Sequence, residues 1–269
     1  MYQTTIALHR LPLHLTHRIY RFLHTTSSCY NLFALGSTAL YTVHGTGVPW
    51  WAAIPLTTLL IRSVMLPVVF WSRNRMIRYA RIKPLIKAWE FQYMKLSYFD
   101  SEKIKKLNQK RNELFHRHSC HPIGSLVLPL VQIPLFFIMT FVLRGMSGSS
   151  FLLFSGLNVP VEVSLAHEGI GWIQDLTVSD PIGFLPVCLG LISLINIQLN
   201  LDFYKEMVSV PIFLTRLAQG NALVFTFVSM QAPTALSLYW VTSSLFSVIQ
   251  NLVLHFVKPL PYFPRHFKK

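Results

Sequence analysis

The sequence has few charged residues, and acidic residues are the scarcest of them. Only 13% of its 269 residues are charged, with 10 Asp and Glu against 24 Lys and Arg. Soluble domains carry about a quarter charged residues, whereas 52% of this chain is hydrophobic. The composition indicates a polytopic membrane protein and leaves no room for a second large soluble domain.

Several sequence signatures of catalysis are also missing. The chain has no P-loop, no Gly-rich nucleotide loop, no hydrolase elbow and no pair of carboxylates inside an apolar segment. We therefore expect no enzyme and no cofactor. Its three cysteines, Cys29, Cys120 and Cys188, lie far apart, which argues against a disulfide framework.

One short cluster raises the question of metal binding. His116, His118, Cys120 and His121 have side chains that suit copper or zinc. Their spacing matches no zinc finger or zincin, and the sequence offers no second pair of ligands. They also fall where a helix is expected to end before Pro122. We predict no metal site here.

The first acidic residue of the chain is Glu90, so residues 1–47 contain Arg, His, Ser and Thr but no Asp or Glu. This composition is typical of a mitochondrial targeting sequence, and the compact apolar core of a secretory signal is absent. We predict that residues 1–47 comprise a mitochondrial targeting sequence and a segment in the intermembrane space. A disordered N-terminal tail is the alternative.

Five apolar segments are long enough to cross a bilayer, which takes about 20 helical residues. The predicted spans are Val48–Trp71, Pro122–Leu143, Pro181–Leu201, Val210–Ser229 and Pro233–Val257. Prolines within them are tolerated where neighbouring helices satisfy the freed carbonyls, and they suggest bent helices around a cavity. No internal repeat is visible, which argues against inverted-repeat transporters.

Loop charge predicts the orientation of these spans. Segment 73–119 contains thirteen Lys and Arg against four acidic residues, whereas segment 144–180 contains one Arg and four acidic residues. Residues 258–269 form a short basic tail. By the positive-inside rule, segment 73–119 and the C-terminus face the matrix, and the N-terminus faces the intermembrane space. The same rule explains the basic composition better than nucleic acid binding does.

Segment 73–119 has helical periodicity on both sides of a break near Asp100. Apolar residues recur at spacings of three and four, from Tyr79 to Tyr93 and from Ile104 to Phe115. We predict an antiparallel helical hairpin at the membrane surface, with a solvated charged loop as the alternative. The predicted fold class is an all-α polytopic membrane protein. It has five transmembrane helices, with a basic helical hairpin between the first and the second.

Arg62 is the only charged residue within the first predicted span, near its middle. An arginine at the centre of a span costs roughly 3 kcal/mol on insertion scales, and no acidic residue in the segment neutralises it. The distance to either end of the span makes snorkelling to the interface strained. We therefore predict that Arg62 faces a hydrophilic groove.

Polar residues on other spans lie at comparable depth. Each alone is most often an interhelical hydrogen bond, but together with Arg62 they can line one groove. The predicted groove residues are Arg62, Gln132, Tyr239, Trp240 and Ser243, with Asn196, Gln198 and Gln250 as further candidates.

Four blocks of the sequence resemble the YidC/Oxa/Alb family of membrane protein insertases. They are Leu59–Pro67 around Arg62, Cys120–Pro122 with Gln132–Pro134, Gly171–Pro186, and Pro233–Asn251. The blocks stand in the family order and extend over most of residues 48–257. Val48–Trp51 and His118–Pro122 are most similar to the mitochondrial branch that serves cytochrome c oxidase assembly.

The resemblance implies a five-helix insertase core over residues 48–257, with a groove open to lipid and to the matrix. In that picture the hairpin 73–119 meets the substrate first. The implied function is insertion of newly made membrane proteins into the mitochondrial inner membrane. The implied client is cytochrome c oxidase subunit two, whose C-terminal tail is moved to the intermembrane space. Its assembly factors are the implied partners.

One departure from the family concerns the C-terminal tail. The general mitochondrial member has a long basic tail for the ribosome, whereas about a dozen residues follow the last span here. We therefore expect no stable ribosome docking. Two alternatives remain open, namely a small-solute channel or carrier that uses the same groove, and a non-translocating oxidase assembly scaffold that uses the histidine and cysteine cluster.

Overall fold

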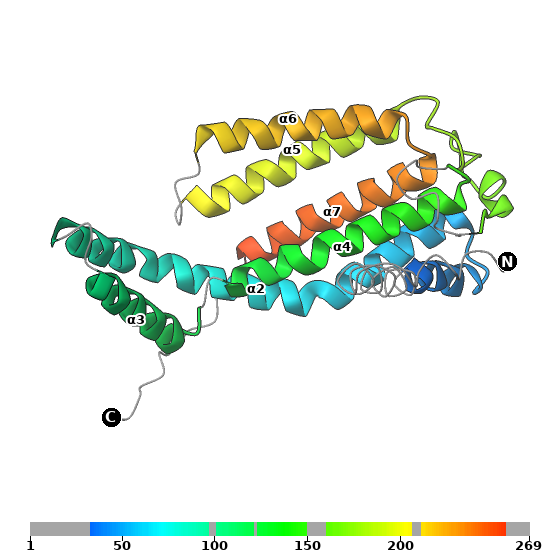
Figure 1. The fold of residues 1–269 in the computed structure, drawn as a ribbon. Helices are drawn as coiled ribbons and strands as arrows, with labels where there is room; N and C mark the ends of the chain where they lie inside the picture. Colours follow the sequence, from blue (N-terminus) through cyan, green and yellow to red (C-terminus); the bar gives the residue numbers. More distant parts are fainter. Residues whose placement is uncertain (1–32, 97–100, 121–122, 150–159, 206–210, 257–269) are drawn as a thin grey trace, which may run out of the picture.

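The computed structural model describes residues 33–96, 101–120, 123–149, 160–205 and 211–256. Within these ranges the fold is helical, and its backbone bridges are two isolated pairs, Ile170 with Ile173 and Ser179 with Pro233. Figure 1 shows a bundle of long helices from which one pair of helices projects at one end.

The longest helix is α2, which runs without interruption from Trp50 to Leu96 over 47 residues. The predicted first span ends at Trp71, whereas α2 continues past it to Leu96, and the helix contains no glycine. Pro55, Pro67 and Pro84 all lie inside α2. A proline removes one backbone donor and disfavours the helix locally, yet α2 continues through all three positions.

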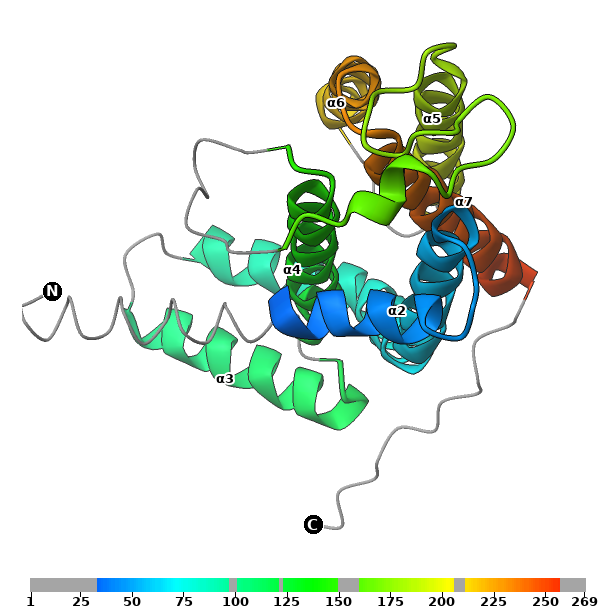
Figure 2. The ribbon, with the colours of Figure 1, turned by 90° about the vertical axis from the view of Figure 1, so that its right-hand side faces the viewer.

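A helix at residues 33–44, called here the N-terminal helix, was not predicted from the sequence. Figure 2 shows it lying across the bundle beside α2 and α4. Leu40 of this helix is completely buried in the main core. Gly36 faces α4, where a Cβ atom would lie 3.3 Å from side-chain atoms of both Ile138 and Val142.

Four further helices complete the bundle. They are α4 (Ile123–Met146), α5 (Phe184–Lys205), α6 (Ile212–Met230) and α7 (Thr234–Phe256). Helix α7 is central, since it packs against α5, α2 and α4, whereas α6 packs mainly on α5. Each helix begins and ends within five residues of a predicted span, except for the long extension of α2.

The extension of α2 pairs with α3 (Ser101–His118) to form the projecting unit of Figure 1, called here the α2–α3 arm. A small core of its own joins the two helices. It contains Ile82, Ile86, Leu114, Phe115 and Cys120, flanked by Tyr79 and Trp89. Apolar residues that recur at helical spacing in the sequence therefore pack between these two helices.

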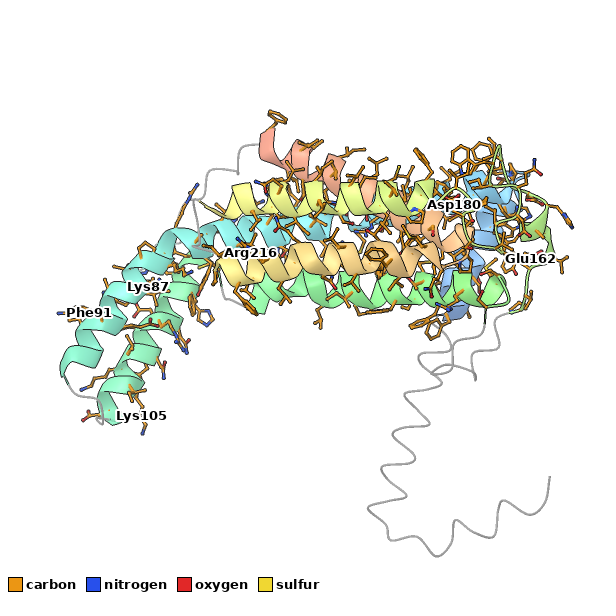
Figure 3. The ribbon with its side chains drawn as sticks, turned by 90° about the horizontal axis from the view of Figure 1, so that it is seen from above. Lys87, Phe91, Lys105, Glu162, Asp180 and Arg216 are labelled. Carbon is orange, nitrogen blue, oxygen red and sulfur yellow. The ribbon has the colours of Figure 1, made fainter. Side chains whose placement is uncertain are left out.

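The opposite end of the bundle carries the segment 160–183, which includes a short 3-10 helix, η3 (Val163–Ala166). Figure 3 labels Glu162 and Asp180 at this end and Lys87 and Lys105 on the arm at the other end. Leu165, Ile173 and Leu176 of the segment are buried in the main core. The long axis of the molecule therefore runs from an acidic end to a basic end.

Four helices in the described ranges are long and apolar enough to cross a membrane. The four candidate spans are Trp50–Gln92, Phe184–Leu201, Ile212–Met230 and Thr234–Leu254. In α4 the apolar stretch Leu130–Met146 is shorter. The protein is thus all-helical with four candidate spans there, and the fifth span stays a prediction.

Candidate functional site

Arg62 lies on α2 twelve residues after its first residue, and its side chain is partly buried. Its Nη2 donates a hydrogen bond to Oγ of Ser243, which is 2% exposed on α7. The guanidinium therefore points into the bundle and contacts a second helix. A charged group at this depth is far from water unless a cleft admits it.

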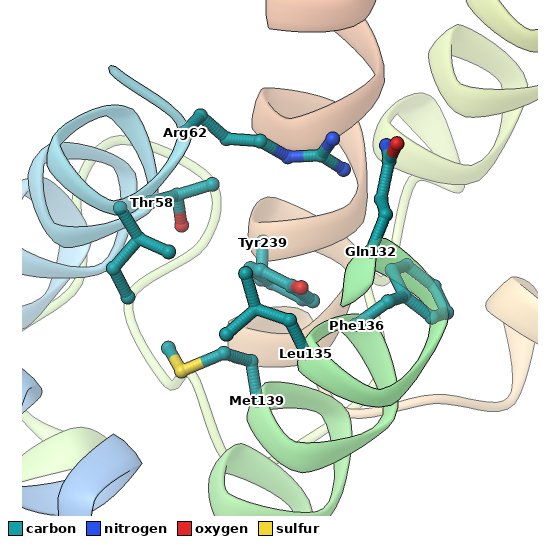
Figure 4. Close-up of a pocket in the computed structure, with 8 residues that line it drawn as sticks. Thr58, Arg62, Gln132, Leu135, Phe136, Met139 and Tyr239 are labelled. Atoms are coloured by element: carbon teal, nitrogen blue, oxygen red, sulfur yellow. The ribbon is translucent and has the colours of Figure 1, made fainter. Parts of the chain in front are cut away.

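A small pocket of about 10 Å³ lies beside Arg62 and is called the Arg62 cleft. Figure 4 shows Arg62 and Gln132 pointing toward each other across it, from α2 and α4 respectively. Tyr239 of α7 forms part of the wall and is 4% exposed. The remaining lining residues are Thr58, Ile61, Leu135, Phe136 and Met139. Three helices far apart in sequence thus bring one cation, one amide and one phenol together.

The structure separates Trp240 from this group. Its indole Nε1 donates to Oγ1 of Thr140 on α4 at 3.1 Å, and its ring lies 4.6 Å from that of Phe225 on α6. Trp240 is 4% exposed, so it joins three helices instead of lining the cleft. An aromatic with a polar atom often takes this role when buried.

The further candidates also lie apart from the cleft. Asn196 on α5 donates from Nδ2 to the backbone oxygen of Ser244 at 2.9 Å and accepts from Nδ2 of Asn251 at 3.2 Å. These bonds join α5 to α7. Gln198 is exposed on α5 and Gln250 is partly buried on α7, and neither lines the cleft.

Sequence reasoning missed the apolar half of the lining. Thr58 lies one helical turn before Arg62, and Phe136 and Met139 lie one and two turns after Gln132. The i, i+3 and i, i+4 spacing was the signal that could have found them, because such residues share a helix face. The lining thus combines the polar groups of Arg62, Gln132 and Tyr239 with an apolar wall.

The chemistry of the cleft is that of binding. The guanidinium of Arg62 can donate to a carboxylate or to backbone carbonyls, and the amide of Gln132 can donate and accept. None of the cleft-lining residues is an acid, a histidine or a cysteine. The group can therefore bind a polar atom that reaches it, in a space of about 10 Å³ that is enough for about one water molecule, and none of its residues is a typical general base.

The acidic end of the bundle is tied down by hydrogen bonds to the start of α2. The Glu168 carboxylate accepts from the backbone N of Trp50 at 3.0 Å, and Nε1 of Trp50 donates to Ser164 at 2.6 Å. His44 stacks on Trp50 with ring centroids 4.0 Å apart. This segment therefore caps α2 and covers the bundle at that end.

Glu162 and Tyr41 extend this network to the N-terminal helix. The Tyr41 hydroxyl donates to Glu162 at 3.0 Å. Burial, together with this bond, raises the pKa of Tyr41 to about 12. The hydrogen bond from Ser164 is the main cause that lowers the pKa of Glu162, and Tyr41 adds to it.

The histidine and cysteine cluster is divided by the fold. Cys120 is fully buried in the core between α2 and α3, whereas the His116 side chain is exposed. Burial raises the pKa of the Cys120 thiol, against the opposing effect of Arg78 and Arg75. His121 lies outside the described residues. In the described ranges no three metal-ligating side chains come together.

The fold and the cleft define a class, an all-helical membrane protein with an arginine-containing polar cleft between its helices. The family described as 60Kd inner membrane protein matches residues 41–259, and the chain belongs to this family. The resemblance to YidC/Oxa/Alb proteins is thereby confirmed. The family contains membrane insertases and assembly factors and not enzymes.

Relatives of several kinds match the chain. It is 30% identical over 227 residues to the mitochondrial cytochrome c oxidase assembly protein COX18 of Pongo abelii, covering 78% of this chain and 66% of that protein. It is 32% identical over 208 residues to cox18 of Schizosaccharomyces pombe, covering 77% and 93%. With the membrane protein insertase YidC of Aromatoleum aromaticum it shares 29% over 214 residues, covering 78% and 33%.

The share of each relative that is covered differs. The chain spans just under two thirds of the length of the Pongo abelii and Homo sapiens COX18 proteins, at 66% for each. It spans one third of the bacterial insertase. The family match over residues 41–259 includes helices α2 to α7, and of the N-terminal helix it includes only residues 41–44.

Proposed function

We propose that this protein is a membrane insertase of the mitochondrial inner membrane that supports cytochrome c oxidase assembly. Family membership supports insertion, and the matched COX18 proteins carry oxidase assembly and mitochondria in their names. The observation that carries the proposal is the polar cleft around Arg62. Arg62 itself lies in a helix able to cross a bilayer.

The cleft lowers the cost of moving a polar chain through the membrane. Backbone and charged groups lose their hydration in hydrocarbon at a cost of several kcal/mol each. The Arg62 guanidinium and the Gln132 amide replace part of that hydration. An acidic side chain in transit gains a counter-charge, and the apolar segment that follows it leaves sideways into lipid.

Five membrane spans follow from this proposal, with α4 as the fifth. The basic α2–α3 arm and the C-terminus then face the matrix, and the acidic segment 160–183 faces the intermembrane space. The charge difference between the two ends of the bundle supports this orientation. Because the matrix is electrically negative, each negative charge moved outward gains about 2.3 kcal/mol per 100 mV.

The proposed client is cytochrome c oxidase subunit two, whose C-terminal tail would move from the matrix to the intermembrane space. The arm would contact the client first, through its excess of Lys and Arg. Residues 1–47 would comprise the targeting sequence and a segment in the intermembrane space, and residues 33–44 within them form the N-terminal helix.

An export assay with substituted proteins tests the role of the cleft. Arg62→Ala should reduce export of an acidic tail at least several-fold, and Arg62→Lys should retain most of the activity because the charge remains. Arg216→Ala is the matched control, since Arg216 is exposed on another membrane helix and does not line the cleft. Equal export by all four proteins would refute the counter-charge role.

Reconstitution separates this function from the alternatives. Purified protein in liposomes should protect an inserted tail from external protease without conducting small solutes. Solute flux without tail insertion would favour a channel or carrier. Oxidase assembly that persists when insertion is lost would favour a scaffold.

A further inference from the structure

A second cavity, separate from the Arg62 cleft, lies between the N-terminal helix, α2 and α4. Its volume is about 480 Å³, within the roughly 300–1,000 Å³ of small-molecule sites. Gly36 and Ala39 line it from the N-terminal helix, Leu60 and Val64 from α2, and Ile138 from α4. Figure 2 shows the N-terminal helix crossing beside α2 and α4.

The lining of this cavity offers nothing to a polar ligand. No described residue that lines it is charged. Its two threonines use their hydroxyl groups within the helix, since Thr38 donates to the oxygen of Ala34 and Thr42 donates to the oxygen of Thr38, both at 2.7 Å. An apolar cavity of this kind does not hold water stably. The occupant must therefore be apolar.

The cavity is also continuous with the surface that meets lipid. Leu60 is 52% exposed and Val64 is 78% exposed, and both lie within two residues of Arg62, inside a helix able to cross a bilayer. Side chains this exposed at that depth contact hydrocarbon.

The remaining space does not suit a client helix. A helix with its side chains is about 10 Å across, and the N-terminal helix already fills the position beside α2 and α4. Gly36 lets the N-terminal helix contact α4, because a Cβ there would lie 3.3 Å from atoms of Ile138 and Val142. We propose that one acyl chain of a membrane phospholipid occupies this cavity.

The bound chain would have a consequence for the neighbouring site. Ile61, Leu135 and Met139 line both the cavity and the Arg62 cleft. They form a wall one side chain thick between an apolar and a polar compartment. An acyl chain behind this wall supports it from the lipid side and keeps the cleft closed in that direction.

Photo-crosslinking of the full-length protein tests this site independently of insertase activity. The protein is reconstituted in phosphatidylcholine bilayers that contain a lipid with a diazirine in one acyl chain, and adducts are located by mass spectrometry. We expect adducts at Leu35, Val64 and Ile138. Adducts at Leu223 and Phe227, which are exposed on α6, report general contact with lipid.

A matched pair of substitutions distinguishes a bound chain from that general contact. Ala39→Trp fills the cavity, and we expect it to lower the cavity adducts at least fivefold while those on α6 stay unchanged. Ala34→Trp makes the same change on an exposed position of the same helix that does not line the cavity. This control should leave every adduct unchanged.

Two results would overturn the proposal. One is an equal yield of cavity adducts in both variants and the unchanged protein. The other is crosslinking of the cavity to the apolar segment of a newly made protein, with no lipid adduct there. Failure of tail export in either variant, with the lipid adducts as expected, bears on the proposed function and not on the lipid site.

Discussion

Arg62 on α2 and Ser243 on α7 are joined by a hydrogen bond although 181 residues separate them in the sequence. The bond joins the helix that continues into the arm to the central helix of the bundle, in addition to their apolar packing. Ser243 is 2% exposed, so its hydroxyl has little competing water. It therefore holds the guanidinium in one orientation beside the cleft.

The first prediction concerns this bond. Ser243→Ala should lower export of an acidic tail several-fold, because the guanidinium loses the acceptor that orients it, while export of a neutral tail changes little. Ser247→Ala is the control, since Ser247 lies one turn further along α7 and bonds to the Ser243 backbone. Equal losses for acidic and neutral tails would show that the change affects folding instead.

The second prediction concerns the contact between α5 and α6. A Cβ on Gly190 would lie 2.4 Å from Oγ1 of Thr226, so small residues let these helices approach closely. Gly190→Ala should destabilise the pair by about 1–3 kcal/mol. Gly190→Ala combined with Thr226→Ala should recover most of that loss. Thermal unfolding in detergent measures both, and an equal effect of Gly190→Ala in either background would contradict the contact.

The third prediction concerns the cap on α2. Glu168 accepts from the backbone N of Trp50, and losing such a cap costs about 1 kcal/mol. Glu168→Ala should expose segment 160–183 to added protease, and Glu168→Gln should have a smaller effect because its amide oxygen can still accept. Glu90→Ala, on the arm, is the control. Equal cleavage of all these proteins would argue against the capping role.

The fourth prediction concerns acid sensitivity at Glu162. Its folded pKa is lowered, so the stabilisation it provides is present above its ordinary value of 4.5 and is lost as the pH falls through the folded pKa. Protease cleavage of segment 160–183 should therefore rise at acidic pH. Tyr41→Phe removes one donor to Glu162 and should shift this onset to higher pH. An unchanged onset would show that the Tyr41 bond contributes nothing.

The fifth prediction concerns Cys120 in the core of the arm. Burial raises its thiol pKa, and the thiolate is the reactive form. In a protein with Cys29→Ser and Cys188→Ser, maleimide labelling should be slow at neutral pH and accelerate only above the range of an ordinary thiol. Phe115→Ala should speed labelling by opening this core, whereas His116→Ala, at an exposed neighbour, should not. Fast labelling of the unchanged arm would contradict its packing.

Much of the fold could be predicted from local patterns. Apolar length placed α4, α5, α6 and α7, and helical spacing predicted that Tyr79, Ile82 and Ile86 share one face. The continuity of α2 could not be predicted, because prolines and a change of composition near Trp71 are typical of a helix end. Its persistence depends on tertiary packing. The N-terminal helix was missed because residues 33–44 lack acidic residues, as the leader before them does, and were assigned together with it.

The residues of the cleft could be predicted only from their depth within the predicted spans. Arg62, Gln132 and Tyr239 meet at the cleft, and Ser243 orients the arginine. Trp240 and Asn196 lie at similar depth but point toward other helices. Depth is readable from position along a helix, whereas the direction of a side chain depends on which neighbour that face meets. The sequence alone does not contain the relative rotation of the helices.

The uninterrupted course of α2 links two parts of the molecule mechanically. At about 1.5 Å per residue, its 47 residues follow a path of about 70 Å, bent in Figure 1, with Arg62 toward one end and half of the arm at the other. A movement of the arm would therefore reach the guanidinium through this bent helix, and Pro67 lies between the two.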